Sequence, residues 1–254
     1  MLILITNDDG YAAPGINALS SVAREFGQVV VVAPERNASG KSMSLTSERP
    51  VRASLVSQHD GLSVFSCDGT PVDCVKLGAE YLCPTPPDLI LSGINHGSNA
   101  SINVLYSGTM GAALEATVNG FQAVGFSLLN HRPDADFSAC LPYVRRIIAQ
   151  VIQSPLPHGV TLNVNFPRLD ADAIRGVRIC REARSCWTDS FERRVDPVGR
   201  PYWWLTGKFV VQDDATDTDE WALAHGFVSI VPTTVDYTAH SLIPQFSTLF
   251  DTHE

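Results

Sequence analysis

The sequence predicts an α/β protein in which a mostly parallel central sheet lies between two layers of helices. Short, continuous apolar runs alternate with segments of helical periodicity along the first two thirds of the chain. Such runs are typical of strands buried on both faces, as in parallel sheets. The first run, residues 2–5, ends abruptly in Asn7-Asp8-Asp9-Gly10. Since open α/β sheets bind ligands at the carboxyl ends of their strands, we expect a Rossmann-like, three-layer fold with its site there.

The elements of this core follow in chain order. Residues 14–26 have apolar side chains at helical spacing and are closed by Gly27, so they predict a helix. The polar segment 35–47 is longer than an ordinary connection and is a candidate functional loop. Thr70-Pro71 is typical of a helix start, ahead of a helix expected over 72–81. Strands are further expected at 29–33, 51–56, 62–66, 87–91, 123–129 and 160–165, with a polar loop at 95–106 and helices at about 107–120 and 139–151.

The last third of the chain has a different character. Aromatic and charged residues alternate through 187–207, which predicts a hairpin. Its segment Tyr202-Trp203-Trp204 is more hydrophobic than an exposed arm should be, so it is either a strand over the core or a subunit interface. We expect a single domain over residues 1–254. Its Rossmann-like core would occupy 1–175, and a C-terminal hairpin, extended segments and an oligomerisation region would occupy 176–254.

Composition excludes several classes of function. The chain has 254 residues, 44% of them hydrophobic, and a formal net charge of −9. An acidic chain does not favour binding to DNA or RNA, so no nucleic-acid duplex is expected as a partner. No apolar run approaches the roughly 20 residues of a membrane span, and the start does not resemble a signal peptide. We therefore expect no membrane partner and a cytoplasmic protein.

The cysteines do not form a recognisable metal site. None belongs to a Cys-x-x-Cys pair, so we expect reduced, partly buried residues and no zinc. The six are Cys67, Cys74, Cys83, Cys140, Cys180 and Cys186.

The adjacent acids Asp8 and Asp9 are the strongest functional signal. Two like charges side by side repel each other and are best tolerated with a cation between them. The alternative is a capped turn before a helix, but the preceding apolar strand favours a metal. The plausible ligands in the loops that follow the predicted strands are all oxygen donors, with Ser39 and Asn95 among them. Such donors suit hard ions such as Mg²⁺, Mn²⁺ or Ca²⁺.

A second signal is Ser107-Gly108-Thr109, at the start of a predicted helix. Its hydroxyls, free backbone N–H groups and the positive end of the helix dipole make an anion site that suits a phosphoryl group. The alternative is simple N-capping by serine or threonine. The nearby glycines Gly108 and Gly111 allow close approach of a ligand or a neighbouring segment.

The histidines offer less. The seven of them show no metal-ligand spacing. His96 stands next to Asn95 and could reach a substrate, although a single loop histidine is more often solvated. Asp236 and His240 lie four residues apart and are interpreted first as a structural pair.

Together these residues resemble the SurE family, the survival protein E enzymes that act as 5′/3′-nucleotidases. Five motifs in the first half of the chain carry the resemblance, and looser matches continue towards its C-terminus. The five are Asn7-Asp8-Asp9-Gly10, Ser39-Gly40, Gly69-Thr70-Pro71-Val72-Asp73-Cys74-Val75, Ser92-Gly93-Ile94-Asn95-His-Gly-Ser-Asn99 and Tyr106-Ser107-Gly108-Thr109-Met-Gly111.

The resemblance implies a phosphomonoesterase that hydrolyses nucleoside 5′- and 3′-monophosphates with one divalent cation per subunit. That cation would be Mg²⁺ or Mn²⁺, with Ca²⁺ as a substitute in crystals. By matching position, the metal ligands would be Asp8, Asp9, Ser39 and Asn95. Asn99 and Ser107 would hold the phosphate or the attacking water. Asn103 stands where an aspartate is usual and Met110 where a valine is typical, but neither is an expected ligand.

The implied reaction is a direct attack by water, with a phospho-aspartyl intermediate as the competing mechanism. The metal would bind a phosphate oxygen and a water and lower the pKa of that water. Asp8 or Asp9 would accept the proton, while Asn95, Asn99 and the helix start from Ser107 to Thr109 contact the substrate. The family also implies a homodimer or homotetramer joined through extended C-terminal segments.

Two other classes share parts of this pattern. A response-regulator receiver also has paired acids that bind Mg²⁺, but it needs a phospho-acceptor aspartate where this chain has Ser92-Gly93-Ile94-Asn95. A dinucleotide-dependent oxidoreductase needs Gly-x-Gly-x-x-Gly after its first strand, which residues 10–15 do not supply. We set both aside.

Overall fold

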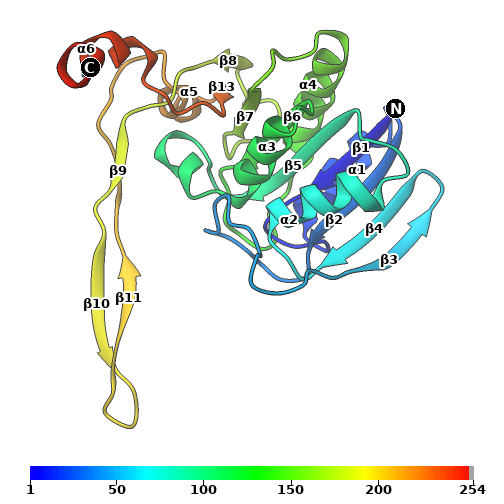
Figure 1. Ribbon diagram of the computed structural model, residues 1–254, viewed down its shortest axis with the longest axis horizontal. Helices are drawn as coiled ribbons and strands as arrows, with labels where there is room; N and C mark the ends of the chain where they lie inside the picture. The colour runs from blue at the N-terminus through cyan, green and yellow to red at the C-terminus, as the bar shows by residue number, and fades with distance from the viewer. Residues whose placement is uncertain (252–254) are drawn as a thin grey trace.

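The computed structural model describes residues 1–251 and confirms the α/β fold, with a mostly parallel sheet at its centre (Figure 1). Within these residues, the central sheet has nine strands, in the spatial order β3 (Ala53–His59), β4 (Leu62–Cys67), β2 (Gln28–Pro34), β1 (Leu2–Thr6), β5 (Leu89–His96), β6 (Ala123–Leu128), β7 (Val160–Phe166), β13 (Val228–Thr234) and β8 (Val177–Ile179). The six strands from β4 to β7 are mutually parallel, whereas β3 and β13 run antiparallel to their inner neighbours.

Helices cover both faces of this sheet. Helices α1 (Pro14–Ala23) and α4 (Leu141–Gln153) lie on one face, and α2 (Pro71–Leu77) and α3 (Gly108–Val118) lie on the other. Helix α5 (Asp219–Ala224) packs on β13, whereas α6 (Ile243–Phe250) lies apart from the sheet and has no buried residue (Figure 1). Four short turns of helix also occur in the described chain: η1 (Gly78–Leu82), η2 (Ser101–Leu105), η3 (Ser138–Cys140) and η4 (His240–Leu242). The remaining strands are β9 (Ser185–Trp187), β10 (Ser190–Val195), β11 (Pro201–Thr206) and β12 (Phe209–Val211).

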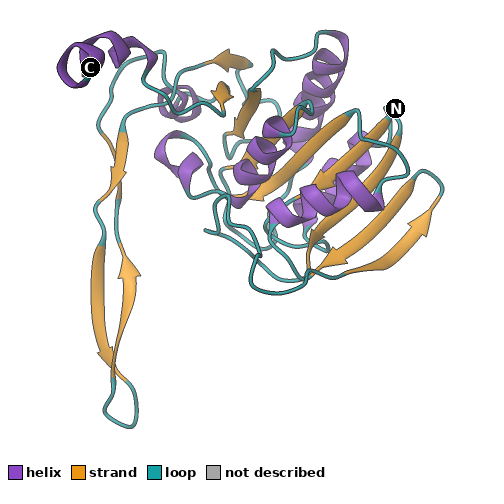
Figure 2. Ribbon diagram, viewed as in Figure 1, coloured by secondary structure: helices purple, strands orange, loops and turns teal. Residues whose placement is uncertain are grey.

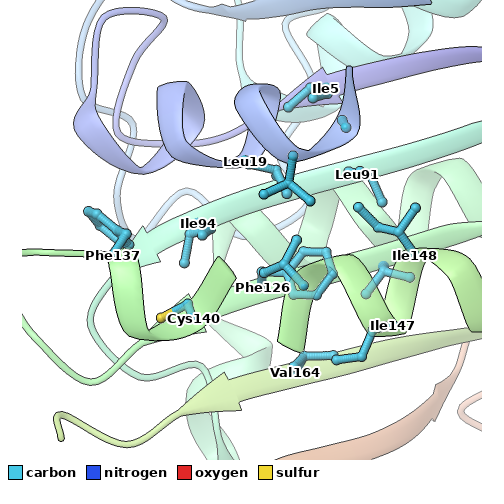
Figure 3. Close-up of a cluster of buried hydrophobic side chains, with 14 of the residues drawn as sticks. Ile5, Leu19, Leu91, Ile94, Phe126, Phe137, Cys140, Ile147, Ile148 and Val164 are labelled. Atoms are coloured by element: carbon cyan, nitrogen blue, oxygen red, sulfur yellow. The ribbon is translucent and has the colours of Figure 1, made fainter. Parts of the chain in front are cut away.

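Alternation along the strands creates two hydrophobic cores. Ile5 of β1 packs in the core on the side of α1 and α4, with Leu19 and Ile148 (Figure 3). Leu4, its neighbour in the same strand, belongs to the opposite core with Met110 of α3. Successive side chains of a strand point to opposite faces, so a continuous apolar run can fill both cores at once. Each fully buried side chain of this size contributes roughly 1.5–3 kcal/mol to stability.

The first helix is shorter than the sequence predicts. It ends at Ala23 rather than at 26, and Gly27 does not close it. Gly27 instead lies against the backbone of Met1, where a side chain would collide with the Met1 carbonyl. A glycine fits there because space is short, not because the backbone is left-handed, and the helical spacing after 23 was misleading.

The boundaries of one other helix and one strand also differ from the sequence prediction. The helix expected over 72–81 is α2 followed by the wider turn η1, and its predicted cap is present: Thr70 Oγ1 accepts the Asp73 N–H at 3.2 Å. The strand expected at 87–91 continues to His96, so Asn95 lies in the end of β5. The predicted loop at 95–106 therefore begins as strand and contains η2.

The C-terminal third contributes more to the sheet than the sequence predicts. Strand β13 adds to β7 in the antiparallel sense, and β8 pairs with β13, so the sheet extends beyond residue 175. The hairpin predicted over 187–207 is present as β10 and β11, which reach away from the body of the molecule (Figure 2). Trp203 and Trp204 are 55% and 58% exposed, so the interpretation as a strand over the core is wrong.

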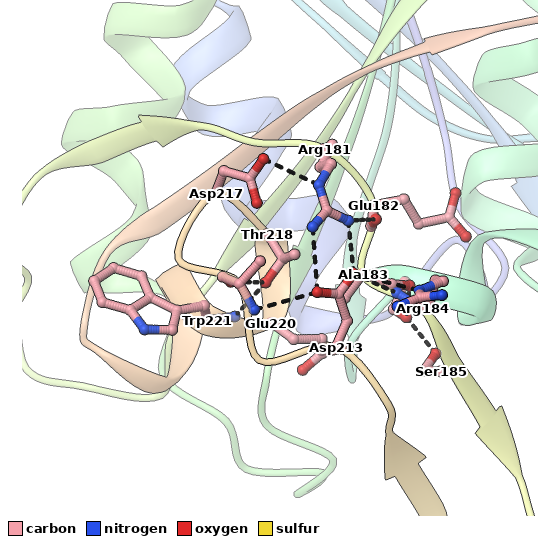
Figure 4. A network of polar contacts seen from close by, with 12 residues as sticks. Arg181, Glu182, Ala183, Arg184, Ser185, Asp213, Asp217, Thr218, Glu220 and Trp221 are labelled. Atoms are coloured by element: carbon pink, nitrogen blue, oxygen red, sulfur yellow. Dashed lines mark hydrogen bonds and ion pairs between the residues drawn. The ribbon is translucent and has the colours of Figure 1, made fainter.

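A polar network fixes the base of this hairpin to the body (Figure 4). Arg181 donates from Nη1 to Asp213 Oδ2 at 2.7 Å and from Nε to Asp217 Oδ2 at 3.0 Å. The buried Asp219 accepts the Ser101 N–H at 2.7 Å and the Ala183 N–H at 2.9 Å. These contacts hold the base of the arm against the body of the molecule.

Two simpler features complete the description of the fold. The cysteines are all free, five of them buried, as predicted. In the part of the chain that the structure describes, no helix combines the length and apolar character needed to cross a bilayer.

Candidate functional site

The carboxyl ends of β1 and β5 lie side by side and carry the candidate site. The two strands pair in parallel, with Thr6 opposite Ser92. After β1, the Asn7 side chain closes a tight turn by donating to the Gly10 carbonyl at 3.0 Å and accepting the Gly10 N–H at 3.1 Å. Gly10 has a φ of 111°, which a residue with a side chain rarely adopts. This turn presents the two acids at the sheet edge.

Asp8 is buried against the start of α3. Its Oδ1 accepts a hydrogen bond from Thr109 Oγ1 at 2.6 Å. A Cβ atom at Gly108 would lie 2.8 Å from Asp8 Cβ and 2.9 Å from its Oδ2, so only glycine allows this approach. The structure therefore brings Asp8, Gly108 and Thr109 together, and the Thr109 hydroxyl is committed to Asp8.

Burial shapes the electrostatics of this acid. Loss of solvent raises the pKa of Asp8, the Thr109 hydrogen bond lowers it, and the charge of Asp9 raises it again. Within residues 1–251, neither acid forms an ion pair with lysine or arginine, and the imidazole ring of His96 contacts Asp9. Two carboxylates in such a position attract a cation.

Asp9 contacts the end of β5. Its Oδ2 accepts two hydrogen bonds from His96, one from the backbone N–H at 3.1 Å and one from the ring Nδ1 at 3.2 Å. The Asp9 side chain is 11% exposed and the His96 side chain is 13% exposed. The histidine is therefore not the solvated loop residue that the sequence favoured.

Hydrogen bonds hold the side chains of both Asn95 and Asn99. The Asn95 amide nitrogen donates to the Gly97 carbonyl at 2.9 Å, so its oxygen is the atom left for a ligand. Asn99 donates from Nδ2 to Ser127 Oγ at 2.8 Å and from its backbone N–H to Asn165 Oδ1 at 2.9 Å. Asn95 and Ser127 are also direct partners in the β5–β6 register. Both asparagines thus have fixed orientations.

The loop that contains Ser39 approaches the acids from the end of β2. The Ala38 N–H donates to the Asp8 carbonyl at 2.7 Å, next to the exposed Ser39. Further along, Ser42 donates from Oγ to the Leu105 carbonyl at 2.6 Å. A Cβ at Gly111 would lie 2.5 Å from the Ser42 carbonyl, so the loop packs closely on α3. The glycines of α3 therefore allow close approach of two segments, Asp8 at Gly108 and the Ser39 loop at Gly111.

Ser107 is the N-cap of α3. Its Oγ accepts the Met110 N–H at 2.9 Å, which leaves the hydroxyl hydrogen free to donate. The first N–H groups of the helix, at Gly108 and Thr109, have no partner within the helix. The two sequence interpretations are thus compatible, because a capped helix start still offers donors and a positive dipole end to an anion.

A cavity of about 590 Å³ opens beside the Ser39 loop, between residues 34–49 and 67–70. Ala38 lines it, and the backbone N–H of the same residue donates to the Asp8 carbonyl, so one residue of the cavity wall contacts the backbone of the first acid. Its wall carries both signs of charge, from three basic and three acidic side chains: Arg36, Lys41, Arg49, Glu35, Glu48 and Asp68. The volume lies in the range of small-molecule sites.

The donor set fits a hard divalent cation. Across the described residues, no group of three or more His, Cys, Asp or Glu could hold a metal. The edge instead combines two carboxylates with hydroxyl and amide oxygens, the donors that Mg²⁺, Mn²⁺ and Ca²⁺ prefer. The observation that favours a bound cation is the buried negative charge of the acids, which has no lysine or arginine partner among residues 1–251.

Sequence reasoning assigned no role to the residues behind the site. Ser127, Asn163 and Asn165 are buried and link β6 and β7 to Asn99. Asn163 and Asn165 alternate with the apolar residues of β7, and that alternation was the available signal. The His96 contact has no local signal, since it joins residues 87 positions apart.

The chain is similar in sequence to proteins of one family. The family model described as "Survival protein SurE" matches residues 3–189. A curated protein of Flavobacterium johnsoniae, "5'-nucleotidase SurE", is 48% identical over 248 residues, which cover 97% of this chain and 96% of that protein. A protein of the same name from Phocaeicola vulgatus is 47% identical, with 95% and 94% coverage.

A solved structure is also similar. The crystal structure of the SurE protein from Aquifex aeolicus superimposes with a TM-score of 0.84 at 34% sequence identity. The match covers 99% of this chain and 100% of that one, so the similarity includes the hairpin and the C-terminal segments.

Proposed function

Because the chain belongs to the SurE family, we propose that it is a nucleotidase that hydrolyses nucleoside monophosphates to nucleoside and phosphate. Relatives at 41–48% identity over nearly the whole chain are named 5'-nucleotidase. The single observation that carries the proposal is the pair Asp8 and Asp9, placed at the sheet edge beside the start of α3, with no lysine or arginine partner in the described chain. Such an edge attracts both a divalent cation and a phosphoryl group.

The proposed cation ligands are Asp8, Asp9, Ser39 and Asn95, with Mg²⁺ or Mn²⁺ as the ion. When bound, such an ion polarises a phosphate oxygen and lowers the pKa of a water. One carboxylate oxygen of each acid is already engaged, by Thr109 in Asp8 and by His96 in Asp9. The acids are therefore oriented before any ligand arrives, which is the preorganisation that catalysis needs.

The start of α3 is the proposed phosphate site. The Ser107 hydroxyl and the N–H groups of Gly108 and Thr109 would donate to phosphoryl oxygens, and Asn99 would orient the phosphate or the water. The cavity beside the Ser39 loop has room for the nucleoside. Asp8 or Asp9 would accept the proton from water in a direct attack. Recovery of a phosphorylated protein after acid quench of the reaction would instead support a phospho-aspartyl mechanism.

The C-terminal region supports assembly into a dimer or tetramer. The strands β10 and β11 are exposed along their whole length, and Trp203 and Trp204 lie on the arm. Helix α6 has no buried residue and presents Phe246 and Phe250 to solvent. Apolar side chains at two such positions are typical of surfaces that another subunit covers. The location in the cytoplasm and the hydrolysis of 3′-monophosphates remain predictions.

The experiment is phosphate release from a panel of nucleoside 5′- and 3′-monophosphates, with Mg²⁺, Mn²⁺ or EDTA. The wild type is expected to release phosphate only with metal, and Asp9→Asn to lose the activity. Asp134→Asn is the matched control, because Asp134 is an exposed aspartate paired with Arg132. No release from the folded wild type with either metal would contradict the proposal.

A further inference from the structure

We propose that His96 is a positioning residue, which orients Asp9 so that one defined carboxylate oxygen faces the cation. This inference rests on the metal site proposed above. It adds a residue that stands beside the expected ligands and was not among them.

The first argument is the geometry at Asp9. Both hydrogen bonds from His96 reach the same oxygen, Oδ2, from the backbone at 3.1 Å and from the ring at 3.2 Å. In the described chain, no hydrogen bond reaches Oδ1. Two donors on one oxygen fix the rotation of the carboxylate and leave the other oxygen as the ligand. A second group that orients a metal ligand in this way commonly changes metal affinity when it is removed.

The second argument is the environment of the imidazole ring. It packs edge-on against Phe137, with ring centroids 5.0 Å apart and an interplanar angle of 87°. Its Nε2 is buried and has no hydrogen-bond partner among residues 1–251. A hydrogen on Nε2 would be a buried donor without an acceptor, whereas a hydrogen on Nδ1 meets Asp9. The surroundings therefore select the tautomer that donates to Asp9.

The third argument is the position of His96 in the chain. It follows Asn95, a proposed ligand, at the end of β5, while Asp9 follows β1. The contact therefore ties the two strand ends that carry the ligands. An aromatic ring that only filled space between the strands would not place a nitrogen atom against the Asp9 carboxylate, as His96 does.

Mn²⁺ binding, followed by the electron paramagnetic resonance of free Mn²⁺, tests the inference without reliance on activity. His96→Phe keeps a ring against Phe137 but removes the donor, and His96→Asn keeps an N–H near the position of Nδ1. We expect the dissociation constant for Mn²⁺ to rise roughly 10–100-fold in His96→Phe. His96→Asn should stay near the wild type, and the thermal midpoint without metal should be similar in all three proteins.

The outcomes separate this inference from the metal site itself. If the wild type binds Mn²⁺, Asp9→Asn does not, and His96→Phe binds as the wild type does, the role of His96 is refuted while the metal site stands. Equal weakening in His96→Phe and His96→Asn also refutes it. If Asp9→Asn binds as the wild type does, the proposed site fails and the inference with it.

A measurement on the unaltered protein gives an independent check. Nuclear magnetic resonance of ¹⁵N-labelled histidine distinguishes the two tautomers of a neutral ring. We expect a hydrogen on Nδ1 of His96, and a neutral ring with its one hydrogen on Nε2 would overturn the inference even if a variant failed to fold.

Discussion

Replacement of Gly108 by alanine tests whether the close approach of α3 to Asp8 matters for activity. The new Cβ would lie 2.8 Å from Asp8 Cβ, whereas carbon atoms ordinarily pack at about 3.5–4.0 Å. Asp8 or the helix start must therefore move by roughly 0.7 Å or more. A misplacement of about 1 Å can reduce catalysis by a factor of about 100. We expect Gly108→Ala to lower kcat/KM by about 30–100-fold, or about 2–3 kcal/mol in the activation barrier.

The assay is the rate of phosphate release from a nucleoside 5′-monophosphate, with urea unfolding measured in parallel. Gly120→Ala is the matched control, just beyond the other end of α3. Gly120 has a φ of 83°, and no atom lies within 4 Å of the place that a Cβ would take, so alanine there introduces backbone strain but no collision. It should lose about 1–2 kcal/mol of stability and keep its activity. Wild-type kcat/KM in Gly108→Ala would refute the reasoning.

Three further predictions concern other parts of the molecule. Ser127→Ala removes the hydroxyl that accepts the hydrogen bond from Asn99 Nδ2. It should lower the free energy of unfolding, measured by urea titration, by about 1–3 kcal/mol, because a buried donor is left unpaired. Unchanged stability would contradict this prediction. Burial, and secondarily the charge of Asp219, raises the pKa of Glu220 to about 7, so the folded state holds this proton more tightly and stability falls as pH rises from about 4.5 to 7. Glu220→Gln should therefore gain thermal stability over the wild type at pH ~8 but little at pH ~5, and an equal difference at both would count against it. The double change of Trp203 and Trp204 to alanine should reduce the mass of the assembly in light scattering, and an unchanged mass would show that these side chains are not essential contacts.

The part of the fold that the sequence predicted well is the part with strong local patterns. Residues 2–5 and 29–33 are continuous apolar runs, and both are buried strands in the structure. The capping signals at Thr70 and Ser107 were also local and correct. Beyond residue 176 the elements depend on distant partners. Strand β13 is fixed by its pairing with β7, which no local pattern reveals.

The site shows the same limit. Local sequence located the acids, because an apolar strand that ends in two aspartates is conspicuous. It could not supply the contact between Asp9 and His96, nor that between Asp8 and Thr109, since these join residues 87 and 101 positions apart. The close approach at Gly108 likewise depends on where α3 lies relative to β1. Distances across a fold come from packing, and a pattern of residue types alone does not determine them.

The most direct test of the account is to locate the metal. Crystals soaked in Mn²⁺ should give an anomalous scattering peak at about 2.0–2.4 Å from oxygen atoms of Asp8 and Asp9, with Ser39 and Asn95 completing the protein ligands. The peak should be absent from Asp9→Asn crystals grown and soaked in the same way. A peak elsewhere, or none at the ends of β1 and β5 while the enzyme is active with Mn²⁺, would contradict the account.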